Sequence, residues 1–395
     1  MKMDDFFLLP TVCVQYKDGK YFLKNLLYHY EKIEIEKLDL IFPQTKLIET
    51  KIFARKSEME SLKEEMFSIL ENKYKNSVTA LGYIETTSAC PYKCKMCPKG
   101  TNKLERTVMT MSMKVFENVI DSLAGQTDIT LHMFGDPLYD ESIYEKIMYA
   151  NNKGIKPSFS TNLVSLKNMN LKKMCKVKIG GMTVSIDSIK PEELSIIRGK
   201  ITQKQIDESF ECLEKIISEA ENSKFIEKIY LQCINFKNNE YTKTQLEKYI
   251  KCRENVEFYE KPFIEFPNTD KVEEALSTVY KKDEWIWLYH ILGMATPYRC
   301  MKPWNKKEAA VLSDGSFVPC CMSYNDKSKL GSIVEEGLED IENGERFLNF
   351  RKNIWSGGEC GEICNLCKLN KNKIIHSEIT EEKIQYLKKL CISYW

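Results

Sequence analysis

The sequence predicts an α/β protein built on a mainly parallel sheet, open or barrel-like. From residue 80 to about residue 260, short runs of β-forming residues alternate with amphipathic helical runs. That alternation is typical of repeated strand–helix units. Outside this stretch the pattern changes: residues 1–78 begin with β-rich segments, and the chain after residue 296 is punctuated by cysteine and tryptophan. We therefore expect a central parallel sheet with two different flanking regions.

The central region predicts six strands, over 81–87, 128–134, 156–161, 181–186, 228–236 and 256–259. Helices are expected from Ser112 onward and over about 140–152, 203–219 and 243–252. Ser112 is a good N-cap residue, because its hydroxyl can accept a hydrogen bond from a free backbone N–H of the first turn. In parallel α/β folds the functional residues gather at the C-terminal ends of the strands.

The flanking regions carry hairpin signals. Strands are expected over Thr11–Tyr16, Tyr21–Leu26 and Lys32–Phe42, with Lys17-Asp18-Gly19-Lys20 as the first turn. A helix over 57–74 is expected to open with a capping box formed by Ser57 and Glu60. A second hairpin turn is predicted at Asp314-Gly315.

Composition excludes several classes of function. Lys and Arg total 58 against 57 Asp and Glu, which argues against a nucleic-acid binder with its basic surface. No apolar run approaches the roughly 18 residues of a membrane span. Two aspartates precede the short apolar patch near the N-terminus, which is wrong for a signal peptide. We expect a soluble, cytoplasmic protein with neither nucleic-acid nor membrane partners.

Cysteine is unusually frequent, with fifteen residues against four histidines. In a reducing compartment clustered cysteines indicate metal or cluster ligands more often than disulfides. The densest cluster is a C-x3-C-x2-C run, Cys90, Cys94 and Cys97, directly after the first predicted strand. Three thiolates can hold a cubane iron–sulfur cluster while leaving one iron open to an outside ligand. A zinc knuckle with a distant fourth ligand is the alternative.

This run resembles the cluster motif of the radical S-adenosylmethionine (SAM) superfamily, and the resemblance extends over residues 80–261. Phe134-Gly135-Asp136-Pro137 is similar to the family's Gly-Gly-Glu-Pro segment, although Phe replaces the first Gly and Asp replaces Glu. The resemblance implies a partial (β/α)6 TIM-like barrel that binds SAM on the open iron. It also implies cleavage of SAM to a 5′-deoxyadenosyl radical that abstracts hydrogen from a substrate carbon. The implied SAM contacts are Met96, Gly135, Asp136, Ser160, Asn162, Ser185 and Arg198.

Two of these roles are specific. Ser185 resembles the residue that contacts the SAM ribose. Arg198 resembles the residue that pairs with the SAM carboxylate, a task suited to the planar guanidinium. Taken singly, each contact residue would be an ordinary turn, strand or helix-end residue; their order along the chain carries the resemblance.

A second cysteine group lies between residues 300 and 367. It resembles the auxiliary-cluster domain called SPASM, in its shortened twitch form. The resemblance implies one auxiliary [4Fe–4S] cluster held by Cys300, Cys320, Cys364 and Cys367. Cys321 and Cys360 are spare cysteines, and Cys360 is an alternative to one of the four ligands. Zinc would be satisfied by the same four thiolates.

The predicted domains follow from these assignments. They are an N-terminal α+β domain over 1–78, the barrel over 79–262, a linker over 263–295, the auxiliary-cluster domain over 296–372 and a C-terminal helix over 373–395. Among the scattered cysteines, Cys233 on the fifth predicted strand is a candidate hydrogen-atom donor to a substrate radical.

The N-terminal domain bears on the substrate. A β-rich domain ahead of the barrel resembles the peptide-recognition domain of peptide-modifying relatives, so we expect a precursor peptide as substrate and epimerisation, crosslinking or thioether formation as the reaction. The alternatives are a dehydrogenase or epimerase of a small molecule such as an aminocyclitol or sugar, and a non-catalytic zinc or iron–sulfur protein. The family resemblance also implies an external one-electron donor of the flavodoxin or ferredoxin type.

Overall fold

The structure is a computed structural model that describes residues 52–234, 240–251, 253–261 and 300–367, parts of 6–35, and residues 49 and 266. The predicted C-terminal helix over 373–395 lies outside the described residues, as does the predicted linker over 263–295 apart from Phe266. None of the helices in the described ranges is long and apolar enough to cross a membrane.

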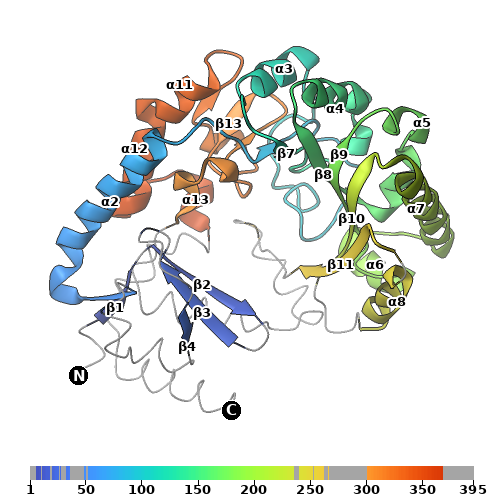
Figure 1. Cartoon of the computed structure of the whole chain (residues 1–395), viewed down its shortest axis with the longest axis horizontal. Coiled ribbons are helices and arrows are strands. Elements are labelled where there is room, and N and C mark those ends of the chain that lie inside the picture. The colour runs from blue at the N-terminus through green and yellow to red at the C-terminus, as the bar shows by residue number, and fades with distance from the viewer. Residues whose placement is uncertain are drawn as a thin grey trace.

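Six parallel strands in chain order form the centre of the molecule, which confirms the predicted partial barrel (Figure 1). Each strand pairs in parallel with the next along the chain. The strands are β6 (Tyr83–Ile84), β7 (Asp128–Thr130), β8 (Lys156–Asn162), β9 (Ile179–Ser185), β10 (Ile226–Ile234) and β11 (Val256–Lys261).

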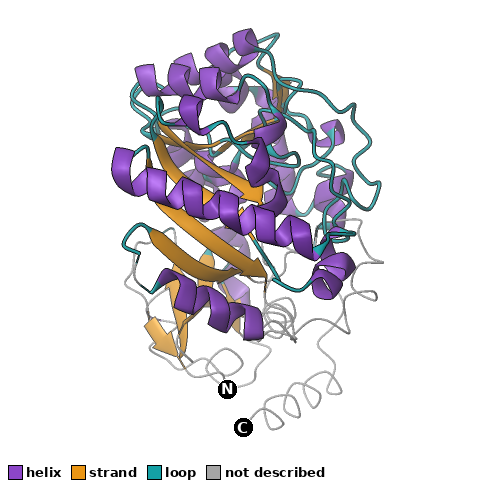
Figure 2. Ribbon diagram, turned by 90° about the vertical axis from the view of Figure 1, so that its right-hand side faces the viewer, coloured by secondary structure: helices purple, strands orange, loops and turns teal. Residues whose placement is uncertain are grey.

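Helices lie along the outside of this curved sheet (Figures 1 and 2). They are α3 (Met113–Asp121), α4 (Ile143–Asn152), α5 (Leu171–Met174), α6 (Pro191–Arg198), α7 (Gln203–Ser223) and α8 (Glu240–Ile250). Ser112 caps α3 as predicted, because its hydroxyl accepts a hydrogen bond from the Val115 backbone at 3.3 Å. Helix α6, which was not predicted, begins at a proline that suits the first turn.

The two faces of the sheet differ in chemistry. Side chains alternate along a strand, and partners in register point to the same side. Leu131, Val184 and Leu231 belong to the apolar core between the sheet and the helices. The opposite, concave face carries polar side chains on adjacent strands, among them Ser160 in register with Thr183 and Gln232 in register with Ser185. The barrel therefore has a polar inner wall.

The C-terminal region extends the same sheet. Strand β12 (Ala310–Val311) pairs in parallel with β6, and β13 (Ser316–Val318) and β14 (Gly331–Ser332) continue antiparallel. The predicted hairpin at Asp314-Gly315 is confirmed, and Gly315 has the positive φ of 86° that such a turn needs. Short helices complete the region: η6 (Lys302–Trp304), α11 (Leu338–Asn343), α12 (Glu345–Ser356) and α13 (Glu362–Leu366).

The N-terminal strands form two small sheets. β2 (Val12–Lys17), β3 (Lys20–Asn25) and β4 (Ile33–Ile35) make an antiparallel sheet with β3 in the centre. β2 and β3 match two predicted strands closely; β4 lies in the third, predicted over Lys32–Phe42, of which residues 36–42 lie outside the described residues. β1 (Phe6–Leu8) pairs with β5 (Phe53–Arg55).

The predicted capping box of the next helix is wrong. Residues Lys56–Glu58 form a 3-10 turn, so Ser57 lies within that turn, and α2 (Met59–Lys75) begins without a side-chain cap. Glu60 instead pairs with Lys63 at 2.5 Å.

Helix α2 packs against the C-terminal region rather than standing apart. Buried Arg351 of α12 donates two hydrogen bonds to Glu71 of α2, at 2.7 and 2.9 Å. The Trp304 indole N–H reaches the same carboxylate at 2.9 Å. The predicted domain boundary at residue 78 thus places α2 and the C-terminal region on which it packs in different domains.

Candidate functional site

The first cysteine group lies on the loop that follows β6, at the C-terminal end of the barrel strands. Cys90, Cys94 and Cys97 are all partly exposed. The loop folds back on itself, since the Cys97 N–H donates to the Cys94 carbonyl at 3.0 Å. It is tied to α6 by a hydrogen bond from the Lys95 N–H to the Ile197 carbonyl at 2.8 Å. The structure thus brings the three predicted sulfur ligands together on one loop.

Burial raises the pKa of each of these thiols, that of Cys90 to about 11. Two cations oppose this effect. Arg198 donates to Cys94 Sγ at 3.9 Å and lowers its pKa. The Lys99 ammonium lowers the pKa of Cys90 and of Cys97 while donating to the Ser88 carbonyl at 2.6 Å. These cations would favour the thiolate form that a metal cluster requires.

Close backbone approaches explain two glycines around this loop. A Cβ at Gly100 would lie 2.0 Å from the Cys94 carbonyl oxygen, and one at Gly135 would lie 2.0 Å from that of Thr87. Neither position has room for a side chain. Gly135 therefore allows the loop after β7 to pack directly against the backbone at Thr87, which precedes the cysteine loop.

Asp136 is buried and its carboxylate is surrounded by internal donors. The Thr161 hydroxyl donates to it at 2.9 Å, the Asn162 amide at 2.8 Å and the Leu138 N–H at 3.1 Å. These bonds use most of the roughly four acceptor positions of a carboxylate. Here Asp136 joins the ends of β7 and β8; its predicted contact with the SAM amino group stays a prediction.

The other predicted SAM contacts lie around the same strand ends. Asn162 caps the turn after β8 by accepting from the Ser165 N–H at 3.0 Å. Ser160 and Ser185 lie on the concave face, and Ser185 accepts from Gln232 at 3.2 Å. Met96 is partly exposed between two of the cysteines.

Arg198 is held by a residue that the sequence did not single out. Its Nε donates to Asp187 at 2.6 Å, and Nη2 also pairs with this carboxylate. Asp187 is buried and has a positive φ of 60°. Its other oxygen accepts from the Ile234 N–H at 3.0 Å. In the sequence, Asp187 is distinguished only by its place two residues after Ser185, the predicted contact of the SAM ribose.

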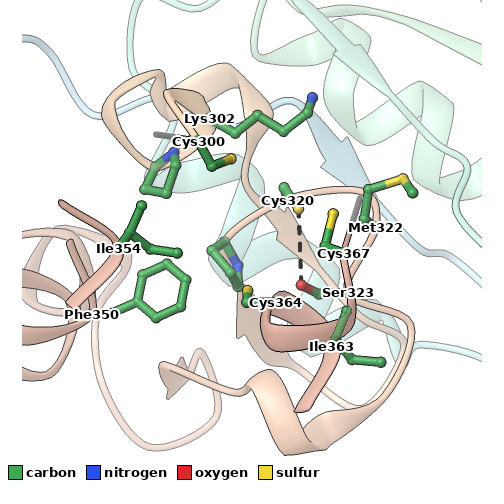
Figure 3. A pocket seen from close by; sticks show the side chains of 12 residues that line it. Cys300, Lys302, Cys320, Met322, Ser323, Phe350, Ile354, Ile363, Cys364 and Cys367 are labelled. Atoms are coloured by element: carbon green, nitrogen blue, oxygen red, sulfur yellow. Dashed lines mark hydrogen bonds between the residues drawn. The ribbon is translucent and has the colours of Figure 1, made fainter. Parts of the chain in front are cut away.

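The second cysteine group gathers around one pocket of the C-terminal region (Figure 3). Its cysteines come from three places: Cys300 lies before η6, Cys320 follows β13, and Cys364 and Cys367 lie at α13. These are the four cysteines that the sequence assigned together.

The two spare cysteines lie beside this group, Cys360 close to Cys364 and Cys321 close to Cys320. Cys360 donates from Sγ to the Gly358 carbonyl at 3.1 Å within its own loop. Cys321 packs against the apolar cluster that contains Phe134 and Tyr324 on the inner side of the barrel. It is close enough to Lys261 at the end of β11 to influence its pKa. Neither spare cysteine lines the pocket of the other four.

The structure argues against Cys233 as a hydrogen-atom donor. Its side chain is fully buried in the apolar core between the sheet and the helices. Its neighbours in β10, Gln232 and Ile234, alternate to the concave face. The sequence could locate Cys233 on a strand but could not show which face the strand buries, because both faces of this strand end carry buried residues.

Buried polar contacts connect the barrel with the C-terminal region. Arg106 donates to Glu85 at the end of β6 at 2.5 Å, to Ser313 at 3.2 Å and to the Tyr324 carbonyl at 2.8 Å. Ser313 also donates to Glu85 at 2.8 Å. These bonds fix the strand end bearing the first cysteine group relative to the region bearing the second.

Sequence reasoning missed two basic residues on the concave face. His132 follows β7, and Lys261 ends β11. The buried Nδ1 of His132 has no hydrogen-bond partner among the residues that the structure describes. Burial lowers the His132 pKa to about 4, and the nearby Lys261 ammonium adds to the effect. In the sequence, these two residues could have been noticed from their positions near the ends of the predicted strands over 128–134 and 256–259.

Comparison with known proteins assigns the central region to a domain family. Residues 84–224 match the model of the radical SAM superfamily. The chain contains a radical SAM domain. Residues 300–368 of this radical SAM protein match the SPASM model, an iron–sulfur cluster-binding domain.

Among curated relatives, a S-adenosyl-L-methionine-dependent 2-deoxy-scyllo-inosamine dehydrogenase of Niallia circulans is 36% identical over 88 residues. The match spans 22% of this radical SAM chain and 32% of that relative, about a third of its length.

Solved structures are similar at lower identity. BtrN in complex with AdoMet and 2-DOIA is 16% identical, with 75% of this chain and 93% of that chain covered and a TM-score of 0.41. SuiB of Streptococcus suis bound to the precursor peptide SuiA is 15% identical, with 93% and 94% covered and a TM-score of 0.40.

The cofactors of this radical SAM protein are [4Fe–4S] clusters and SAM. Both cysteine groups consist of thiols alone, the ligand type of such clusters. Together with the match to an iron–sulfur cluster-binding domain, the thiol groups fit clusters.

Proposed function

We propose that this radical SAM enzyme modifies a precursor peptide, by epimerisation, crosslinking or thioether formation. Cys90, Cys94 and Cys97 would hold the SAM-binding cluster. A second cluster would be held by Cys300, Cys320, Cys364 and Cys367. When bound, the first cluster and SAM supply the organic radical that takes hydrogen from a substrate carbon. An external donor of flavodoxin or ferredoxin type would provide electrons.

The chain's own residues would prepare this site. Arg198 and Lys99 place positive charge beside the thiolates of the first group. The polar concave face offers hydrogen bonds to a substrate: Tyr259 donates to Gln232 at 2.7 Å, and Gln232 donates to Ser185. Such a preorganised row would orient a polar group in the barrel.

One observation carries the peptide assignment, the small antiparallel sheet of β2, β3 and β4. Strands β2 and β4 are at its edges in the described part of the chain. An extended peptide can add to such an edge through main-chain hydrogen bonds. Strand β2, with six residues, offers the longer edge.

The test is a truncation that removes residues 1–50 and retains α2. A random-peptide display library selected on the immobilised, cluster-loaded chain provides the probe. Peptides selected on the full chain should bind the truncated chain at least about tenfold more weakly, which is 1.4 kcal/mol. Iron content and SAM cleavage should stay unchanged, because α2 still packs against the C-terminal region. Equal peptide binding by both chains would contradict the assignment.

A second candidate is a small-molecule dehydrogenase, favoured by the 88-residue match to the 2-deoxy-scyllo-inosamine enzyme. It predicts anaerobic turnover of that aminocyclitol by the full chain with SAM and a reductant. Turnover of the aminocyclitol, with no peptide selected by the library, would favour this candidate over the first.

A further inference from the structure

Two basic side chains, His132 and Lys261, lie close to each other on the concave face. Among the residues that the structure describes, the buried Nδ1 of His132 has no hydrogen-bond partner, and Lys261 forms no ion pair. Register places Lys261 beside Ile234 and two residues beyond Tyr259, whose partner Gln232 faces Ser185. His132 follows Thr130, which is in register with Ser158. Both therefore project toward the inner wall, from the second and the last of the six parallel strands.

Lys261 forms no ion pair in the described part of the chain, although it is only partly exposed. The carboxylates near the two basic residues are already paired: Asp187, close to Lys261, is bound by Arg198, and Glu85, close to His132, is bound by Arg106. Burying an ammonium without a counter-charge is costly, so this site favours an incoming anion.

His132 offers the complementary chemistry. It is neutral at physiological pH, since burial holds its pKa at about 4. A neutral imidazole has one nitrogen donor and one acceptor, so a buried nitrogen without a partner can receive an N–H or O–H donor. The site thus presents a cation and a neutral hydrogen-bonding nitrogen side by side.

Resting on the proposed peptide function, we infer that His132 and Lys261 recognise an acidic residue of the substrate peptide. Lys261 pairs with the side-chain carboxylate, and His132 accepts a hydrogen bond from a neighbouring amide N–H. A cationic amine, such as that of an aminocyclitol, is repelled by Lys261 at the same place. The pair would therefore select among substrates by charge.

The test uses three small probes and the cluster-loaded full chain with SAM, under anaerobic calorimetry. The probes are N-acetylglutamate amide, N-acetylglutamine amide as its neutral isostere, and 2-deoxy-scyllo-inosamine. The wild-type chain should bind the glutamate probe about tenfold more tightly than the glutamine probe, the effect of one charge-assisted hydrogen bond. Lys261→Met should abolish that preference.

Two further variants complete the experiment. His132→Phe should weaken both amino-acid probes by a similar factor, because both carry the amide N–H. Lys228→Met is the matched control: this lysine lies near the other end of β10, pairs with Glu257, and should leave the preference intact.

Equal binding of the glutamate and glutamine probes, or a preference that survives Lys261→Met, would overturn the inference. Tighter binding of the inosamine would also overturn it, as would no binding of the glutamate probe. Selection of peptides from the display library by the full chain, measured separately, reports on the proposed peptide function and keeps the two failures distinguishable.

Discussion

Arg198 connects Asp187 to Cys94. Its Nε donates to the buried carboxylate at 2.6 Å, and its Nη1 reaches the sulfur at 3.9 Å. The carboxylate fixes the direction of the guanidinium, since its other oxygen is held by the backbone of β10. Arg198 therefore couples the end of the barrel to the first cysteine group.

Arg198→Lys tests that coupling. A lysine keeps the charge but cannot hold a carboxylate and a sulfur with separate nitrogens of one rigid plane. We expect less iron at the first group and about tenfold slower SAM cleavage, with the second cluster unaffected. Arg253→Lys, whose partner Glu214 lies on a helix outside the sheet, is the control. If Arg198→Lys kept the iron content and the SAM cleavage rate of the wild type, the planar guanidinium of Arg198 would not be needed.

Removal of single cysteines should separate the two groups. Two cubane clusters correspond to about eight irons per chain. Cys94→Ala should lose about four of these irons and all cleavage of SAM to 5′-deoxyadenosine. Cys364→Ala should retain some SAM cleavage but form no product. Cys175→Ala, outside both groups, should match the wild type; zinc in the second group would refute its assignment as a cluster.

The pair of Glu71 and Arg351 should govern stability. Glu71→Ala leaves the buried Arg351 guanidinium without its carboxylate, and breaking a buried pair on one side costs about 3–5 kcal/mol. Urea unfolding of the metal-free chain measures the loss. Glu60→Ala on the same helix removes an exposed pair and should change stability by about 0.5 kcal/mol or less. Similar losses in both variants would contradict the structural role of α2.

His132 should remain neutral well below pH 6.5, with a pKa of about 4 caused first by burial and then by Lys261. The unfolded chain would take up this proton at higher pH, so the folding stability from His132 is present above about pH 6.5 and falls as pH decreases toward 4. Imidazole NMR of the metal-free chain measures the pKa, and the missing signal in His132→Gln assigns it. Lys261→Met should raise the value. A measured pKa near 6.5 for His132 would contradict its burial beside Lys261.

Features that depend on neighbours along the chain could be predicted from the amino-acid sequence. The strand–helix alternation, the Ser112 cap, the Asp314-Gly315 turn and the spacing of Cys90, Cys94 and Cys97 are all local, and local chemistry suffices to predict them. The failed capping box at Ser57 is a local prediction that a competing 3-10 turn overrode.

Features that depend on strand register and on packing could be established only from the folded chain. Cys233 faces the helices because the pairing of β10 sets its side, and a shift by one residue would reverse it. Asp187 meets Arg198, Glu71 meets Arg351, and His132 approaches Lys261 across chain separations that no local pattern encodes. A buried charge needs a partner because it is removed from water. The fold determines which residue lies close enough to be that partner.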